Sequence, residues 1–126
     1  MTASILIVDD NPVNLKLASE ILTMEGYAVV SAVDAEEALQ VLKGITPALV
    51  LMDIALPGMD GLTLTRQLKA DPRLKSLPIV ALSAFAMKGE AEKALQAGCD
   101  GYITKPIDTR KFPAQVAAYL RPASPP

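Results

Sequence analysis

The sequence predicts an α/β fold with one doubly wound parallel sheet of five strands, ordered 2-1-3-4-5, and helices on both faces. Two observations carry this prediction. Five short apolar runs alternate with five segments of helical periodicity, and the short turns between them are typical of βα units with right-handed crossovers. The length of 126 residues, 51% of them hydrophobic, suits one packed domain. We assign residues 1–121 to that domain and 122–126 to a short tail.

The first strand is predicted over residues 4–8, a β-branched run that stops at Asp9 and Asp10. Asn11 and Pro12 then indicate a helix start, with Asn at the N-cap and Pro at the first helical position. The helix carries an apolar stripe that we expect to be buried, and it ends at Gly26. The stripe consists of Val13, Leu17 and Ile21, with Ala18 and Leu22 beside it.

The second strand is predicted over 27–31, and a capping box follows it. Asp34 suits the N-cap and Glu37 the third helical position. This helix stops at Gly44, and its apolar residues are Ala38, Leu39, Val41 and Leu42.

The third strand is predicted over 47–52 and leads into Asp53. The third helix follows the pair Asp60-Gly61, breaks at Asp71-Pro72, and points Leu64 and Leu68 inward. The fourth strand is predicted over 77–82 and the fifth over 101–104.

The fourth helix, residues 87–97, is closed by Gly98 and has few large apolar residues. Its candidates for burial are Met87, Ala91, Ala94 and Leu95. Because small side chains gain little from packing, we expect this helix to be the element that shifts in a conformational change. The last helix runs to about Leu120, and Pro113 places its regular start near that proline or distorts its first turn.

Composition excludes several classes of function. The net charge is only −2 without a basic block, which argues against nucleic acid as a partner. The absence of histidine excludes a Ser-His-Asp triad, a histidine metal site and a phosphohistidine carrier. The single cysteine, Cys99, cannot form an internal disulfide. Neither a signal peptide nor a membrane span is evident. We therefore expect a cytoplasmic protein with no membrane contact.

Carboxylates end two strands that neighbour each other in the predicted order. Asp9 and Asp10 follow the first strand and Asp53 ends the third. Ligands of open α/β sheets bind at the carboxyl ends of the strands. Three carboxylates gathered there would repel one another, and a hard cation such as Mg²⁺ (or Mn²⁺) would relieve the repulsion. The simpler alternative is that Asp9 and Asp10 only cap the following helix.

Two further strands bring a hydroxyl and a positive charge to the same edge. Ser83 follows the fourth strand and Lys105 the fifth. Together with Asp53 as nucleophile and a bound cation, they form a set suited to a phosphoryl group on Asp53, with two groups that neutralise its oxygens.

In these residues and their spacing, the sequence resembles the receiver domain of two-component response regulators. The matching residues are the acidic pair Asp9-Asp10, Asp53, Ser83, Lys105-Pro106 and the turn Leu56-Pro57-Gly58-Met59-Asp60-Gly61. The resemblance covers about residues 4 to 121 and implies the flavodoxin-like fold. The segments Ser83-Ala84-Phe85-Ala86-Met87-Lys88-Gly89 and Cys99-Asp100-Gly101-Tyr102 are similar to those of single-domain receivers of the DivK type and of hybrid-kinase receivers.

The resemblance implies a role for each matched residue. Asp53 would accept a phosphoryl group from a partner's phosphohistidine. Asp10, Asp53 and the backbone carbonyl of Ala55 would bind Mg²⁺, with Asp9 helping through water. Lys105 would pair with the phosphate, or with Asp53 before phosphorylation.

The same resemblance implies a switch. Ser83 and Ala84 would contact the phosphoryl group, Tyr102 would move inward, and the bond between Lys105 and Pro106 is a candidate cis peptide. The alternative for Tyr102 is a half-buried strand aromatic without a switching role. Ala55 and Phe85 occupy positions that affect loss of the phosphoryl group. Neither hydrogen-bonds an attacking water, so we expect a long-lived phosphorylated form.

The implied partners are a sensor histidine kinase or histidine phosphotransfer protein and a downstream protein target. We expect the latter to bind the surface formed by the fourth helix, fifth strand and fifth helix. The protein would be a monomer or weak dimer and not an enzyme, apart from catalysing its own phosphorylation and slow dephosphorylation. The initial Met1 favours a standalone receiver over one excised from a hybrid kinase.

Three rival functions make different demands on the sequence. A Mg²⁺-dependent phosphatase would need a second acid where Ala55 stands. A flavin binder would meet phosphate repulsion from Asp9 and Asp10. A purely structural receiver would lack part of the acidic set, which is complete here.

Overall fold

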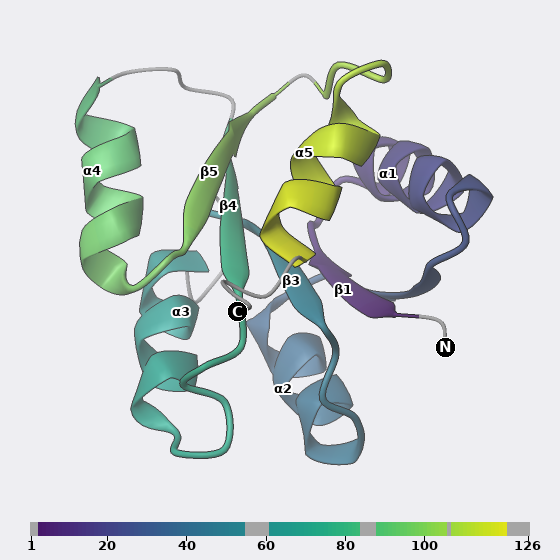
Figure 1. The fold of residues 1–126 in the computed structure, drawn as a ribbon. Coiled ribbons are helices and arrows are strands. Elements are labelled where there is room, and N and C mark those ends of the chain that lie inside the picture. Colours follow the sequence, from purple (N-terminus) through teal and green to yellow (C-terminus); the bar gives the residue numbers. More distant parts are fainter. Residues whose placement is uncertain (1–2, 55–60, 84–87, 106, 121–126) are drawn as a thin grey trace, which may run out of the picture.

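A computed structural model of the chain describes residues 3–54, 61–83, 88–105 and 107–120, and for residues 88–91 the backbone only. Five strands alternate with five helices along the chain, and the strands form one sheet covered by helices on its two faces (Figure 1). This is the predicted α/β architecture.

The sheet is parallel throughout and has the predicted order β2-β1-β3-β4-β5. Its strands are β1 (Ser4–Val8), β2 (Ala28–Ala32), β3 (Leu49–Asp53), β4 (Ile79–Ser83) and β5 (Gly101–Thr104). Every residue of β3 and β4 is buried, as expected for strands covered on both faces. Buried runs of this kind explain why the strand positions could be predicted within one or two residues.

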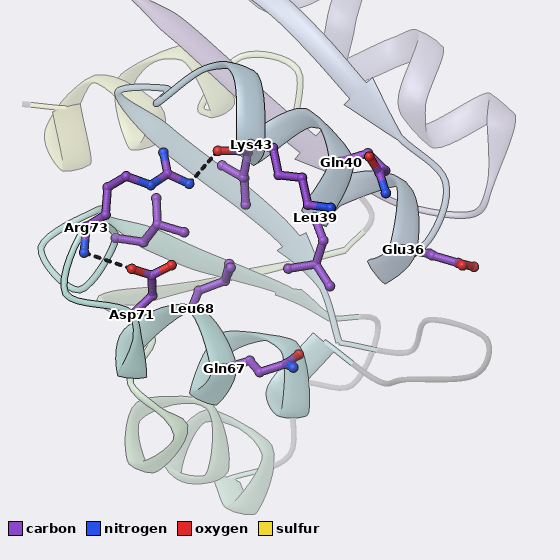
Figure 2. Close-up of a pocket in the computed structure, with 10 residues that line it drawn as sticks. Glu36, Leu39, Gln40, Lys43, Gln67, Leu68, Asp71 and Arg73 are labelled. Atoms are coloured by element: carbon purple, nitrogen blue, oxygen red, sulfur yellow. Dashed lines mark hydrogen bonds between the residues drawn. The ribbon is translucent and has the colours of Figure 1, made fainter.

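The helices are α1 (Pro12–Met24), α2 (Ala35–Gly44), α3 (Gly61–Ala70), α4 (Lys88–Ala97) and α5 (Phe112–Leu120). Figure 1 shows α1 and α5 on one side of the sheet and α2 and α3 on the other, with α4 beyond the edge strand β5. A groove lies between α2 and α3 (Figure 2). No helix in the described ranges is long and apolar enough to cross a lipid bilayer.

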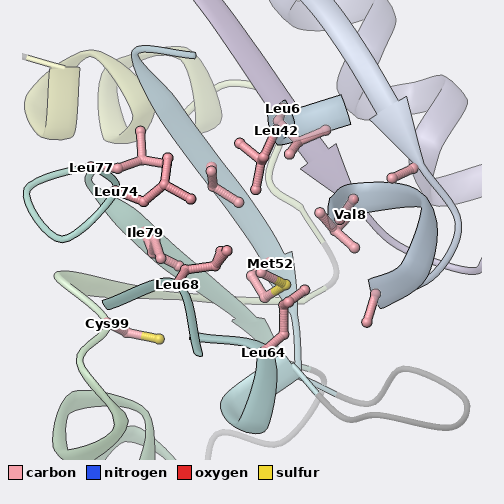
Figure 3. Close-up of a cluster of buried hydrophobic side chains, with 14 of the residues drawn as sticks. Leu6, Val8, Leu42, Met52, Leu64, Leu68, Leu74, Leu77, Ile79 and Cys99 are labelled. Carbon is pink, nitrogen blue, oxygen red and sulfur yellow. The ribbon is translucent and has the colours of Figure 1, made fainter. Parts of the chain in front are cut away.

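Two aliphatic cores hold these layers together. The first packs β1, β3 and β4 against α2 and α3, and Figure 3 shows Leu42, Leu64 and Leu68 meeting Met52 and Ile79 in it. The second lies under α1 and α5, where the buried side chains include Leu15, Leu22, Phe112 and Val116. Phe112 is the largest fully buried side chain of the described residues. The sheet is thus buried on both faces.

Both predicted N-caps are confirmed. The Asn11 side chain accepts the backbone N–H of Val13 at 2.9 Å. Asp34 accepts the N–H of Glu37 at 2.8 Å, and the Glu37 carboxylate in turn accepts the N–H of Val33 at 3.0 Å. The bonds to the N–H groups of Val13 and Glu37 satisfy donors that the first helical turn leaves free, and the Glu37 bond to Val33 fixes the residue before the cap.

The predicted buried stripe of α1 is only partly right, because Ala18 and Leu22 are buried as expected but Val13, Leu17 and Ile21 are not. Val13 is 73% exposed and Leu17 37% exposed, and Ile21 is only partly buried. The buried residues of this helix are Leu15, Ala18 and Leu22. The helix carries two apolar stripes at helical spacing, and packing against the sheet and α5 selects the second.

The predicted burial of α4 residues is half right. Ala94 is fully buried, but Leu95 is 54% exposed and was wrongly expected in the core. Met87 and the side chain of Ala91 lie outside the described residues.

The structure decides between the two positions considered for Pro113 in α5. This proline is the second residue of a helix that begins at Phe112, where no intrahelical N–H is required of it.

Candidate functional site

The candidate site lies at the carboxyl edge of the sheet, at the ends of β1, β3, β4 and β5. Val8, the last residue of β1, pairs with Met52 of β3. The next residues along these two strands are Asp9 and Asp53. The register therefore places the two acids side by side, as the strand-end argument predicted.

Asp10 completes a cluster of three carboxylates. One oxygen from each of Asp9, Asp10 and Asp53 lies within 4.8 Å of the others. Asp9 and Asp53 are only 1% and 5% exposed, whereas Asp10 is exposed. The cluster therefore has a buried floor and one acid facing solvent. This arrangement goes beyond helix capping, which Asn11 performs instead.

Lys105 occupies the floor of this cluster. Its ammonium lies 2.8 Å from Asp9 Oδ2 and 3.2 Å from Asp53 Oδ2, and its side chain is 13% exposed. Burial alone would lower the pKa of Lys105, but the hydrogen bond to Asp9 and the charges of Asp53 and Asp9 outweigh it and raise this pKa. The lysine is held as a cation between two buried carboxylates.

The pairing of Lys105 was only half anticipated. The expected contact with Asp53 is present, but the contact with Asp9 is shorter, and sequence reasoning missed it. The other oxygen of Asp9, Oδ1, accepts the backbone N–H of Asn11 at 2.9 Å. Asp9 thus joins the start of α1 to the lysine. The sequence does not indicate which of the two carboxylates the flexible lysine side chain will contact more closely.

Gly61 is a second feature that sequence reasoning missed. A Cβ at this position would overlap the backbone oxygen of Asp53 and would lie 2.8 Å from Ile54 Cα. The Gly61 N–H donates to the Ile54 carbonyl at 3.2 Å, and Thr65 donates to the Gly61 carbonyl at 2.8 Å. The start of α3 is therefore pressed against the backbone of Asp53. In the sequence, the pair Asp60-Gly61 predicts a turn, but it does not predict that Gly61 lies against the backbone of Asp53.

Ser83 and Tyr102 lie on the adjoining strands. Ser83 is 2% exposed at the end of β4, and its carbonyl accepts the backbone N–H of Lys105 at 2.7 Å. Tyr102 is half-buried on β5 and packs against the first core. The other predicted site residues, Ala55, Ala84, Phe85 and Pro106, lie outside the described residues. So do the turn 56–60 and the tail 122–126.

The chemistry of the donor set fits a hard divalent cation. Three carboxylates offer oxygen ligands, and the exposed Asp10 leaves the cluster open on its solvent side. Mg²⁺ prefers such oxygens and keeps several waters, which an open cluster permits. The Lys105 ammonium, beside Asp9 and Asp53, brings one positive charge against three carboxylates. The cluster therefore keeps a net negative charge that attracts a cation.

Comparison with known proteins gives a consistent result. The family model of the response regulator receiver domain matches residues 5–117. The polar-differentiation response regulator DivK of Brucella ovis is 42% identical over 120 residues, which cover 95% of this chain and 98% of that protein.

Solved structures agree with this match. A putative response regulator from Chloroflexus aurantiacus has a TM-score of 0.91 at 32% identity, covering 95% of this chain and 98% of that one. The receiver domain of a sensor histidine kinase from Pseudomonas aeruginosa has a TM-score of 0.86 at 32% identity, with the same coverage. That structure has a magnesium ion coordinated in its active-site cleft.

The family match covers most of the chain, and the acidic cluster lies where receivers carry their phosphoacceptor site. Members of this family are switches of two-component signalling rather than enzymes in the usual sense. The chain belongs to the response regulator receiver domain family and is a DivK-like response regulator.

Proposed function

We propose that Asp53 is the phosphoacceptor and takes its phosphoryl group from a histidine of a partner protein. The observation that carries the proposal is the placement of Asp53 beside Asp9 and Lys105 in one buried cluster. In the transfer, an Asp53 oxygen bonds to phosphorus as the bond from phosphorus to the histidine nitrogen breaks. The donor must come from outside because the chain has no histidine.

The acids of the cluster and Lys105 would have different roles in the transfer. Asp9, Asp10 and Asp53 would hold the cation, Mg²⁺ or Mn²⁺, with the Ala55 carbonyl as a further proposed ligand. When bound, the cation neutralises phosphoryl oxygens during transfer. Lys105 would release Asp9 and contact the phosphoryl group, whose added negative charge attracts its ammonium.

The switch proposal concerns the other strand ends. Ser83 and Ala84 would contact the phosphoryl group, and Tyr102 would respond from the next strand. Since β4 and β5 lead into and out of α4, a change at Ser83 would bias the position of that helix. We propose the surface of α4, β5 and α5 as the output face, where Leu95 is 54% exposed for a downstream protein.

The donor would dock beside the site on the first turns of α1. This helix begins two residues after Asp10, and its exposed side chains Val13 and Leu17 lie one turn apart on the same face. An apolar face next to the phosphoacceptor suits a helix of the histidine-bearing partner, a histidine kinase or phosphotransfer protein. The wrongly predicted stripe thus becomes a candidate recognition surface.

Phosphotransfer profiling tests the proposal directly. Radiolabelled histidine kinases or phosphotransfer proteins of the source organism are mixed with the chain and with Asp53→Asn, and label on the chain is followed over time. The chain accepts label rapidly from its cognate donor and Asp53→Asn does not. Equal labelling of the variant would contradict the assignment of Asp53.

A matched pair of α1 variants tests the docking surface. Val13→Arg should slow transfer from the protein donor about tenfold, the size of a lost apolar contact with a charge left against it. Met24→Arg, at the far end of the same helix and 85% exposed, should not. Both variants should accept phosphoryl groups normally from acetyl phosphate. Equal slowing by both variants would exclude this surface.

The stability of the phosphorylated form is a further part of the proposal. Ala55 cannot hydrogen-bond an attacking water, and Phe85 would shield the site. We therefore expect loss of the phosphoryl group to be slow. A half-life of seconds, measured without any phosphatase, would contradict this expectation.

A further inference from the structure

The start of α1 is tied to the acidic cluster through its N-cap residue, Asn11. The Asn11 side chain accepts the backbone N–H groups of Val13 at 2.9 Å and of Asn14 at 3.3 Å. The backbone N–H of Asn11 donates to Asp9 Oδ1 at 2.9 Å. Asn11 is therefore bonded to the helix by its side chain and to a buried acid of the cluster by its backbone.

The backbone of Asn11 has little freedom. Its φ of −90° and ψ of 113° lie in the extended region, to which the following proline, Pro12, restricts it by steric contact. Its carbonyl accepts the N–H of Leu15 at 3.0 Å in the first turn of α1. With its N–H, its carbonyl and its side-chain oxygen all bonded, Asn11 fixes the point at which the chain enters the helix.

Asp10 stands between two residues that are held firmly. Asp9, before it, is only 1% exposed and donates its backbone N–H to the Ala32 carbonyl at 3.0 Å, while Asn11 follows it. Among the residues that the structure describes, the Asp10 side chain has no hydrogen bond or ion pair of its own. One of its oxygens nevertheless lies within 4.8 Å of those of Asp9 and Asp53. The neighbours of Asp10 along the chain therefore position its carboxylate.

We propose that Asn11 is a positioning residue of the cation site, because its cap holds Asp10 where the carboxylate would bind Mg²⁺. The inference rests on the proposed function, since it concerns the cation that the phosphoacceptor site would hold. A ligand on a loosely held backbone must be ordered when the cation binds, and that ordering costs free energy. The cap orders the backbone beforehand and so raises the affinity for the cation through Asp10.

Substitutions at the cap test the proposal by calorimetric titration with MgCl₂, without any phosphodonor. Asn11→Ala removes the acceptor oxygen and should weaken Mg²⁺ binding about fivefold, the size expected when the backbone of one residue is no longer ordered beforehand. Asn11→Ser supplies a cap oxygen of similar rank and should restore the affinity. Unchanged affinity in Asn11→Ala, or equal weakening in Asn11→Ala and Asn11→Ser, would overturn the proposal.

The N-cap of α2 provides a matched control. Asp34→Ala removes the bond to the Glu37 N–H at 2.8 Å, whereas Asp34→Asn removes the same charge but keeps a cap. The two variants should bind Mg²⁺ equally, although Asp34→Ala should unfold at a lower urea concentration. Weaker Mg²⁺ binding by Asp34→Ala than by Asp34→Asn would show that loss of any N-cap weakens the site, which contradicts a specific role of Asn11.

Urea unfolding shows whether each variant folds. If Asn11→Ala does not, Asn11→Gly takes its place, because glycine is tolerated at an N-cap but lacks the acceptor oxygen. It should weaken Mg²⁺ binding at least as much, since glycine also loosens the backbone. The absence of Mg²⁺ binding by the unchanged chain would overturn the proposed cation and this inference with it. Binding that no Asn11 variant weakens would overturn the inference alone.

Discussion

Lys105 is the residue that offsets the charge of the two buried carboxylates. Its ammonium bridges two buried carboxylates, Asp9 and Asp53, that would otherwise repel each other at close range. The same ammonium opposes a divalent cation, because both require these oxygens. We therefore expect the lysine to stabilise the cluster and to lower its affinity for a cation.

Replacement of this lysine should tighten metal binding. We expect Lys105→Gln to bind Mg²⁺ about tenfold more tightly by calorimetry, since one opposing charge is removed at short range. The control is Lys16→Gln, an exposed lysine of α1, which should not change the affinity. Unchanged or weaker binding by Lys105→Gln would show that the lysine does not compete with the cation.

Lys105 should also give the protein a characteristic loss of stability at alkaline pH. Its pKa is raised on folding, so the folded state holds this proton more tightly than the unfolded chain does. The corresponding stability is fully present below pH 10.5, the ordinary value, and is lost as the pH rises through the raised pKa. Urea unfolding from pH 9 to 12 measures this loss.

The measurement needs a background without the buried thiol. Burial raises the pKa of Cys99 above its ordinary 9.0, so the unfolded chain loses the thiol proton first and stability falls from that pH upward. A Cys99→Ala protein removes this contribution. In it, the further change Lys105→Met should abolish the steep fall above pH 10.5. A fall of the same steepness with and without Lys105 would refute its assignment.

Helix α3 begins against the end of β3, the strand that carries Asp53. Its first residue, Gly61, lies against the backbone of Asp53 and Ile54, and Thr65 in the next turn holds the Gly61 carbonyl. Thr65 in turn accepts a hydrogen bond from Cys99 before β5, with the two atoms 3.8 Å apart. The strand end, α3 and the approach to β5 are therefore packed as one unit.

Two glycine substitutions test this packing. Gly61→Ala should destabilise the fold by about 2–4 kcal/mol, because its Cβ would meet backbone atoms that cannot move aside cheaply. Gly44→Ala, at the last residue of α2, has nothing within 4 Å of the added Cβ. It should be neutral or stabilise by up to ~1 kcal/mol. Urea unfolding measures both, and equal effects of the two substitutions would contradict the close contact.

Element prediction from sequence succeeded where one physical requirement dominated. Strands β3 and β4 are buried on both faces and must be continuous apolar runs, so their positions were evident. Helix α1 offered two apolar stripes, and α4 offered adjacent Ala94 and Leu95, of which only the first is buried. Which face of such a helix turns inward is decided by its neighbours, which a local pattern does not contain.

At the scale of the whole molecule, the parallel sheet brings residues distant in sequence to one edge. Asp9, Asp53, Ser83 and Lys105 come from the ends of four strands, and the predicted strand order was enough to gather them. The individual contacts within the site could not be predicted from the sequence. The Lys105 bond to Asp9 depends on a side-chain rotamer, and the Gly61 contact depends on the angle at which α3 leaves the sheet.

Phosphorylation of Asp53 is tested most directly by intact-protein mass spectrometry. After incubation with acetyl phosphate and Mg²⁺, the chain should gain the mass of one phosphoryl group. The gain should be lost on addition of a chelator beforehand and in Asp53→Asn, while Asp71→Asn, an acid outside the cluster, should be modified normally. Equal phosphorylation of Asp53→Asn and the unchanged chain would contradict the central assignment.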